Sequence, residues 1–295
     1  MINKQRTRNA GFSLTEVLMA AGILAVGFMM LLTLFPLGLQ LTAKQTEATI
    51  GTLAAREAFS NASMIMQSNL TQKLPVPNSG YEDFRSIFWT DNADGVIDDR
   101  EGDYVAGNGD YELSYDPYLF LYPTASDVSD ENKKYNSAVL IGDLNGDYAE
   151  AIVFACRRVG TEANFPLLVA DDILTNAEHV GNRPSLLSLQ IDNDFVDDAE
   201  RGDLLKIHST HDLVLDTVGI DKFISLDSYI AADSTGNIYR VVGIQSGTGE
   251  YYIRINAGLT GAQREAFGRI WFVPPAIGAN RSAAVDASRQ TIKVK

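Results

Sequence analysis

Residues 11–38 read GFSLTEVLMAAGILAVGFMMLLTLFPLG, and this stretch decides how the rest of the chain is organised. From Phe12 to Gly38 the only ionisable side chain is Glu16. At about 1.5 Å per helical residue, the stretch is long enough to cross a hydrocarbon core of roughly 30 Å. A secretory signal has a shorter apolar region of about 7–15 residues with a small-residue cleavage site behind it. We therefore expect residues 12–38 to form a membrane-spanning helix that is kept in the mature protein.

A short basic segment precedes the apolar stretch. Residues 1–11 carry Lys4, Arg6 and Arg8 and no acidic residue. Positive charges beside a membrane span stay on the cytoplasmic side. The expected topology is a single pass through the inner (cytoplasmic) membrane, with the N-terminus in the cytoplasm and the remainder of the chain outside.

The carboxylate of Glu16 needs an explanation, because a charge inside a lipid-buried helix costs about 2.5–3.5 kcal/mol on insertion scales. Together with the basic leader, the run Gly11-Phe12-Ser13-Leu14-Thr15-Glu16 resembles the type III signal of type IV pilins and type II secretion pseudopilins. The continuation, residues 17–28, is most similar to V-type minor pilins and I-type minor pseudopilins. The resemblance covers only the N-terminal part of the chain.

This resemblance implies a processing and assembly pathway. A prepilin peptidase would cut after Gly11 and methylate the new N-terminal residue, Phe12. Glu16 would neutralise the terminal amine of a neighbouring subunit during assembly. The implied partners are the membrane, the prepilin peptidase, and the other pilins or pseudopilins of a pilus or secretion pseudopilus.

Residues 39–73 are expected to continue the helix in amphipathic form. Their apolar or small residues recur at spacings of three and four. These are Ile50, Leu53, Ala54, Ala58, Ala62 and Ile65. Pro36 should kink or locally melt the helix, and Pro75 and Pro77 should end it.

Residues 74–295 are expected to form a β-rich globular head. Strands are expected at Glu112–Asp116, Ser137–Ile141, Glu150–Arg157, Leu204–His208, Ser225–Ala231, Asn237–Ile244, Glu250–Ile255 and Arg269–Val273. Thr291–Lys295 is expected either to add an edge strand or to fray. Turns at residues 234–236 and 246–249 predict an antiparallel meander over residues 225–255. The predicted fold class is α+β, with a long N-terminal helix packed on an antiparallel sheet that carries long acidic loops.

Two of the acidic loops are candidate Ca²⁺ sites, because oxygens at alternate positions of a tight loop converge on one point. The first candidate set is Asp143, Asn145, Asp147 and Glu150, and the second is Asn92, Asp94, Asp98 and Glu101. The second set matches a helix-loop calcium motif only in part, since Thr90 stands where an aspartate is wanted. A third acidic loop spans residues 192–203. For each loop, plain solvation of the carboxylates is the alternative.

Charge and composition exclude several functions. The formal net charge of −14 argues against nucleic acid as a partner. The single cysteine, Cys156, cannot form an intrachain disulfide, and its apolar neighbours predict that it is buried. His208 and His211 would point to opposite faces of a strand, and no nucleophile motif accompanies them. We expect that the protein is not an enzyme.

The sequence therefore favours a minor pilin or pseudopilin, a structural subunit assembled through its N-terminal helix. The alternative is a membrane-anchored, calcium-dependent binding or adhesion module whose N-terminus is never cut. A third class, an exported hydrolase on an anchor, requires a nucleophile and base whose spacing the sequence does not show.

Overall fold

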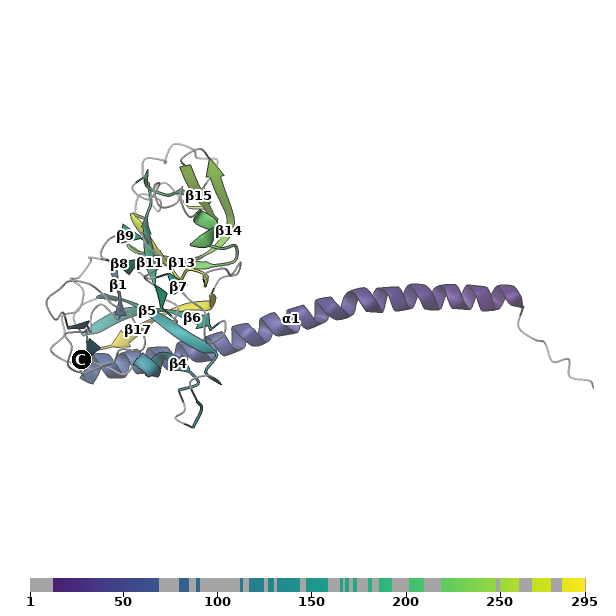
Figure 1. The fold of residues 1–295 in the computed structure, drawn as a ribbon, viewed down its shortest axis with the longest axis horizontal. Helices are drawn as coiled ribbons and strands as arrows, with labels where there is room; N and C mark the ends of the chain where they lie inside the picture. The colour runs from purple at the N-terminus through teal and green to yellow at the C-terminus, as the bar shows by residue number, and fades with distance from the viewer. Residues whose placement is uncertain are drawn as a thin grey trace, which may run out of the picture. The chain divides into compact units, whose positions relative to one another are not determined.

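The computed structural model describes residues 13–68, 80–84, 89–90, 112–113, 117–124, 127–129, 132–143, 147–158, 165–166, 168–169, 172–173, 180–181, 186–192, 202–209, 219–247, 250–259, 267–276 and 283–294. These residues form one long helix and several antiparallel β-sheets (Figure 1), which confirms the α+β class. The chain divides into two compact units, Met1–Glu47 and Ala48–Lys295.

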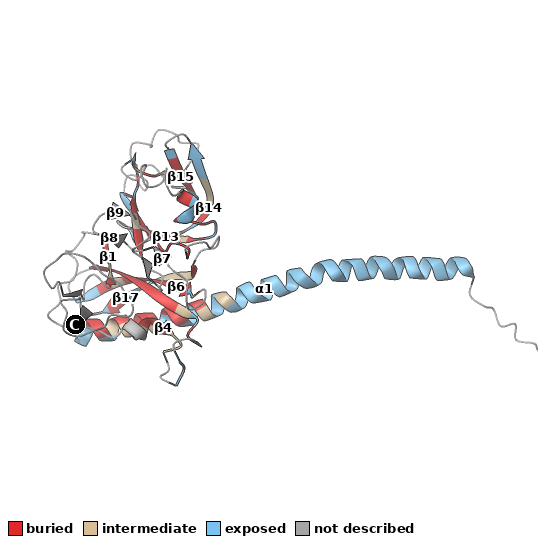
Figure 2. Ribbon diagram, viewed as in Figure 1, coloured by how far each residue is buried: buried red, intermediate tan, exposed pale blue. Residues whose placement is uncertain are grey.

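Helix α1 runs from Leu14 to Ser68 and belongs to both units. Every residue from Ser13 to Thr46 is exposed, although most of these side chains are apolar (Figure 2). Among the described residues, α1 is the one helix long and apolar enough to cross a membrane. The expected local melting at Pro36 is wrong, because the helix continues through this residue. One missing backbone hydrogen bond does not end a helix whose flanking residues are mostly strong helix formers.

The part of α1 that belongs to the second unit buries a single stripe of mostly small residues. The buried residues are Gly51, Ala54, Ala55, Ala58, Phe59, Ala62, Ile65 and Met66. Four members of the predicted face are confirmed, whereas Leu53 is 45% exposed and Ile50 is half-buried. The stripe is shifted from the prediction because Gly51 and Ala55 let the helix axis approach the sheet closely. An ideal Cβ at Gly51 would lie 2.9 Å from the Cβ of Asp286.

A five-stranded antiparallel sheet receives this stripe. Its order is β1 (Tyr81–Asp83), β5 (Tyr135–Asp143), β6 (Tyr148–Arg157) and β17 (Ala284–Lys293), and β4 (Leu121–Tyr122) pairs with the first residues of β5. Alternate residues of a strand point to opposite faces. Accordingly, Ala149, Ala151, Val153 and Ala155 of β6 lie in one hydrophobic cluster with the stripe of α1. Small residues on both partners allow this close packing of helix and sheet.

The other face of the five-stranded sheet packs against a second sheet. Ile152, Phe154 and Cys156 of β6 are fully buried in a cluster that also holds Ala231 and Trp271 of the second sheet. The cysteine is therefore buried, as its apolar neighbours predicted. Strand β6 is thus covered on both faces, which explains its nearly continuous apolar sequence.

The second sheet has six strands and closes on itself. Its order is β11 (Leu187–Gln190), β16 (Arg269–Phe272), β13 (Tyr229–Ala232), β14 (Ile238–Gly247), β15 (Glu250–Ile255) and β12 (Leu204–Lys206). An antiparallel bridge between Ile191 and Ile207 joins the two terminal strands. Backbone bonds flank it, with Asp192 N donating to Lys206 O at 2.8 Å and His208 N donating to Gln190 O at 3.0 Å. The sheet is therefore a small closed barrel, inserted in the chain between β6 and β17.

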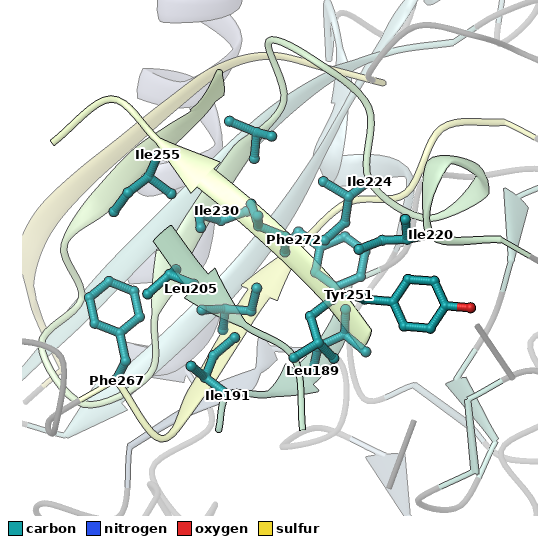
Figure 3. Close-up of a cluster of buried hydrophobic side chains, with 14 of the residues drawn as sticks. Leu189, Ile191, Leu205, Ile220, Ile224, Ile230, Tyr251, Ile255, Phe267 and Phe272 are labelled. Carbon is teal, nitrogen blue, oxygen red and sulfur yellow. The ribbon is translucent and has the colours of Figure 1, made fainter. Parts of the chain in front are cut away.

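Large aliphatic and aromatic side chains fill this barrel. Figure 3 shows part of the cluster, in which side chains from opposite walls such as Leu189, Ile230 and Tyr251 converge. The short 3₁₀ helix η5 (Ile220–Lys222) adds Ile220, and the turn that follows it adds Phe223. Among the described residues of this cluster, none comes from α1 or from the five-stranded sheet. The barrel thus has a hydrophobic core of its own.

The head differs from the prediction in two respects. Where one sheet was expected, there are two larger ones, of which the second closes into the barrel, although the meander β13–β14–β15 is confirmed. A C-terminal strand was expected no earlier than Thr291, but β17 begins at Ala284. Three further strand pairs are short: β2 (Trp89–Thr90) with β3 (Glu112–Leu113), β7 (Phe165–Pro166) with β10 (Val180–Gly181), and β8 (Leu168–Val169) with β9 (Asp172–Ile173). A 3₁₀ helix, η1 (Pro117–Phe120), precedes β4.

Candidate functional site

The N-terminus of α1 carries the sequence-predicted assembly residue, Glu16. Its Oε2 accepts hydrogen bonds from the backbone N–H of Ser13 at 2.9 Å and from the Ser13 hydroxyl at 3.1 Å. In return, the Glu16 N–H donates to Ser13 Oγ at 3.3 Å. This reciprocal pattern is a capping box, in which a serine before the helix and a glutamate three residues later satisfy each other's backbone donors. The Glu16 side chain therefore folds back toward the N-terminus of α1, where its carboxylate contacts Ser13.

Ser13 is further connected to Thr15, whose Oγ1 lies 2.9 Å from Ser13 Oγ. Since the single hydroxyl proton of Ser13 points at Glu16, the Thr15 hydroxyl is the donor in this contact. The three side chains form a small polar group at the beginning of an exposed apolar helix. The predicted processing residues, Gly11 and Phe12, lie outside the described residues.

The predicted calcium loops are described only in part. Asn145, the side chain of Asp143, and the whole set Asn92, Asp94, Asp98 and Glu101 lie outside the described residues. Of the two remaining residues, Asp147 immediately precedes β6, and Glu150 lies in its first part. No group of three or more acidic, histidine or cysteine side chains that could hold a metal is present in the part of the chain that the structure describes.

The two ends of the third acidic loop are paired with cations of the barrel. Asp192 lies 3.4 Å from Lys206 Nζ, and Asp203 lies 3.2 Å from Arg254 Nε. Lys206 also pairs with Glu250 at 3.2 Å. These ion pairs are partly exposed, so each contributes little to stability. They hold the strand ends on either side of the loop.

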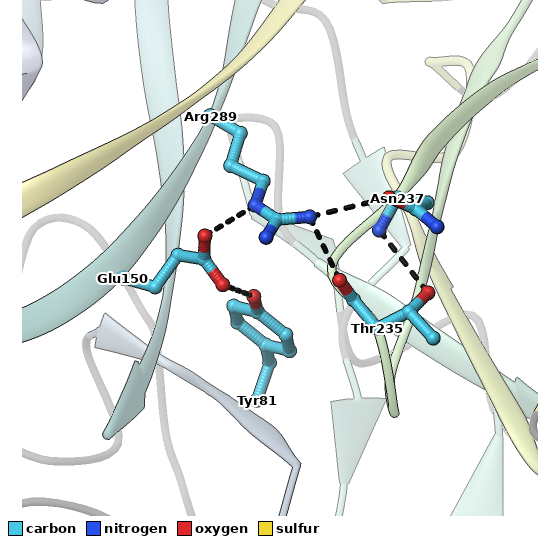
Figure 4. Close-up of polar contacts among 5 residues, drawn as sticks. All are labelled: Tyr81, Glu150, Thr235, Asn237 and Arg289. Atoms are coloured by element: carbon cyan, nitrogen blue, oxygen red, sulfur yellow. Dashed lines mark hydrogen bonds and ion pairs between the residues drawn. The ribbon is translucent and has the colours of Figure 1, made fainter. Parts of the chain in front are cut away.

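Glu150 takes part in a different arrangement, a polar network between the five-stranded sheet and the barrel. Figure 4 shows its carboxylate between two donors, the hydroxyl of Tyr81 from β1 and the Nε of Arg289 from β17. Arg289 Nη1 continues across to the barrel and donates to Thr235 O at 2.8 Å and to Asn237 Oδ1 at 3.2 Å. The carboxylate predicted as a calcium ligand thus accepts hydrogen bonds from two side chains of its own sheet.

A second carboxylate, Asp233, reinforces the same junction. Its Oδ1 accepts the backbone N–H of Tyr81 at 2.9 Å and the indole N–H of Trp271 at 2.7 Å. The turn after Asp233 contains Gly236, which has a positive φ of 64°. A Cβ there would lie 2.0 Å from the Tyr81 hydroxyl oxygen. Only glycine permits this turn and the Tyr81 ring to occupy adjoining space.

The network raises the pKa of the Tyr81 phenol well above its ordinary value of 10.0. Burial is the largest cause, and the hydrogen bond to Glu150 and the negative charge of Glu150 act in the same direction. The folded chain therefore favours the neutral phenol.

This shift predicts an alkaline loss of stability that depends on Tyr81. The pKa of Tyr81 is higher in the folded state than in the unfolded state. The stabilisation that the neutral phenol gives the folded state is therefore complete below pH 10, and it is lost as the pH rises through the pKa of the folded state. We expect Tyr81→Phe to make the decline of the unfolding free energy above pH 10 shallower. The measurement is denaturant unfolding as a function of pH.

The comparison belongs in a Cys156→Ala background, because burial also raises the pKa of the Cys156 thiol above its ordinary value. With that second alkaline group removed, an unchanged pH slope in Tyr81→Phe would contradict the prediction. At neutral pH the same variant should lose about 1 kcal/mol, the typical net value of one hydrogen bond.

Sequence reasoning did not find Tyr81, Asp233 or Arg289, because they come from segments far apart in the chain and share no spacing. Of the two histidines that were not expected to act as a pair, His208 follows β12, and His211 lies outside the described residues. In comparisons with known proteins, no family model, no curated protein and no solved structure matches this chain.

Proposed function

We propose that this chain is a pilin-like structural subunit, a minor pilin or pseudopilin, which is inserted in the inner membrane and then assembled into a filament through α1. The observation that carries the proposal is the N-terminal part of α1, which exposes apolar side chains from Leu14 to Leu41 on all sides of the helix. Such a surface is unstable in water and requires lipid or other apolar helices around it.

The single carboxylate at the beginning of this helix supports assembly over simple anchoring. A plain anchor gains nothing from Glu16, whereas in a filament the terminal amine of a neighbouring subunit can neutralise it. The basic leader would remain in the cytoplasm, and cleavage after Gly11 would create the amine at Phe12. The acidic loops and the barrel of the head would then face away from the cytoplasm.

The first experiment is N-terminal and intact mass analysis of the chain recovered from its native membrane. A mature chain that begins at methylated Phe12 is the expected result. A chain that still carries Lys4, Arg6 and Arg8 would contradict the proposal and favour the uncut, membrane-anchored binding module.

The second experiment tests Glu16 directly. We expect Glu16→Leu to be processed normally but to enter sheared filaments at least about tenfold less, since a charge-assisted hydrogen bond is worth about 1.5–3 kcal/mol. Glu47→Leu is the matched control, because Glu47 is a carboxylate on the same helix outside the apolar run. Equal incorporation of both variants would refute the role of Glu16.

A further inference from the structure

We propose that Ser13 is a positioning residue for Glu16, and that it orients the glutamate toward the amine of an incoming subunit. This inference rests on the proposed function. Both bonds that Ser13 gives to the Glu16 side chain end on the same oxygen, Oε2, at 2.9 and 3.1 Å. The side chain is therefore fixed by one oxygen only.

The other oxygen, Oε1, receives no hydrogen bond from the described residues, and Glu16 is exposed. A primary ammonium has three N–H donors and an N-methylated one has two, so either can bind Oε1 while Ser13 keeps Oε2. The group recognised is thus a primary or secondary ammonium in an apolar setting, since Glu16 is the only ionisable side chain between Phe12 and Gly38.

Prior orientation matters because a free glutamate side chain samples many rotamers and loses that freedom when it binds. In the capping box, the Glu16 side chain loses its rotamer freedom when the helix folds, so this entropy is not lost again during assembly. Ser13 therefore strengthens assembly without contacting the neighbouring subunit itself.

A simpler role for Ser13 is helix capping alone, and the two roles make different predictions in a double-mutant cycle. If Ser13 acts through Glu16, its removal has no effect once Glu16 is absent. If Ser13 only caps the helix, its removal has the same effect with or without Glu16.

The experiment uses the full chain in its native membrane and counts only the processed molecules, identified by their N-terminal mass. The readout is the fraction of processed subunit in sheared filaments for wild type, Ser13→Ala, Ser13→Thr, Glu16→Leu and the double variant Ser13→Ala/Glu16→Leu. We expect Ser13→Ala to lower this fraction about fivefold, the size typical of losing an N-cap side chain. Ser13→Thr keeps the hydroxyl and should stay close to wild type.

The double variant should match Glu16→Leu alone. A further fivefold loss in the double variant, or normal incorporation of Ser13→Ala beside a defective Glu16→Leu, would overturn the inference and leave the proposed function intact. Normal incorporation of Glu16→Leu, or an uncut N-terminus, would instead refute the proposed function and this inference with it.

Discussion

Phe154→Ala should lower the unfolding free energy of the chain by about 3–5 kcal/mol, the usual cost of truncating a buried phenylalanine. Phe154 is fully buried between the five-stranded sheet and the barrel. Its neighbours in that cluster belong to two layers that are each held by their own strand pairing, so they cannot collapse into the space left by the ring. The loss therefore includes a cavity in addition to the transfer free energy of the ring.

Urea unfolding of the detergent-solubilised chain, followed by tryptophan fluorescence, measures this effect, because Trp271 lies in the same cluster. Leu226→Ala is the matched control, since this leucine belongs to the barrel region but is 60% exposed. The control should change stability by less than about 0.5 kcal/mol. A loss below about 1.5 kcal/mol for Phe154→Ala would mean that the layers repack, contrary to the structure.

Arg289→Met should cost about 2–3 kcal/mol. The Glu150 side chain is only 12% exposed, so removing its cationic partner leaves a poorly solvated charge. The expected value is below that of a fully buried pair, because Arg289 itself is 37% exposed. Methionine keeps the aliphatic length of the side chain, so the loss reports the missing charge and its bonds to the Thr235 carbonyl and Asn237.

Neutralising the partner provides the test of this cause. The double variant Arg289→Met/Glu150→Gln should regain part of the loss, because a neutral amide needs no cation and still accepts the Tyr81 hydroxyl. Arg254→Met, which breaks an ion pair with Asp203 that is about 40% exposed on both sides, should cost less than about 1 kcal/mol. If Arg254→Met and Arg289→Met cost the same, the network at the sheet-barrel junction has no special role.

Local sequence signals predicted the elements that depend on local chemistry. The apolar run and the absence of charge after Glu16 predicted the long helix, and the turn residues around Gly236 predicted the meander. Both the helix and the meander depend on interactions between residues that are close together in the sequence. The predicted buried positions Ala54 and Ala58 also follow from helical spacing alone.

Features that depend on distant partners could not be predicted. Residues 284–290 contain few β-branched residues, and they form the first part of β17 because β6 offers a pairing edge. The barrel closes through the bridge between Ile191 and Ile207, and no local sequence pattern predicts this pairing. The network of Tyr81, Glu150 and Arg289 likewise joins three separate strands. The Ser13–Glu16 hydrogen bonds are different, because they are local: the spacing Ser13-x-x-Glu16 ahead of an apolar run is a capping-box signal that could have predicted them.

The insertion of the barrel between β6 and β17 also determines the order in which the head can fold. Strand β6 pairs along nearly its whole length with a strand roughly 130 to 145 residues further along the chain, and such distant pairings form slowly. During synthesis, the β5–β6 hairpin emerges long before its final neighbour and presents an unpaired edge in the meantime. Among the described strands, the one that leaves the ribosome after all the others, β17, is therefore the one that completes the sheet on which α1 packs.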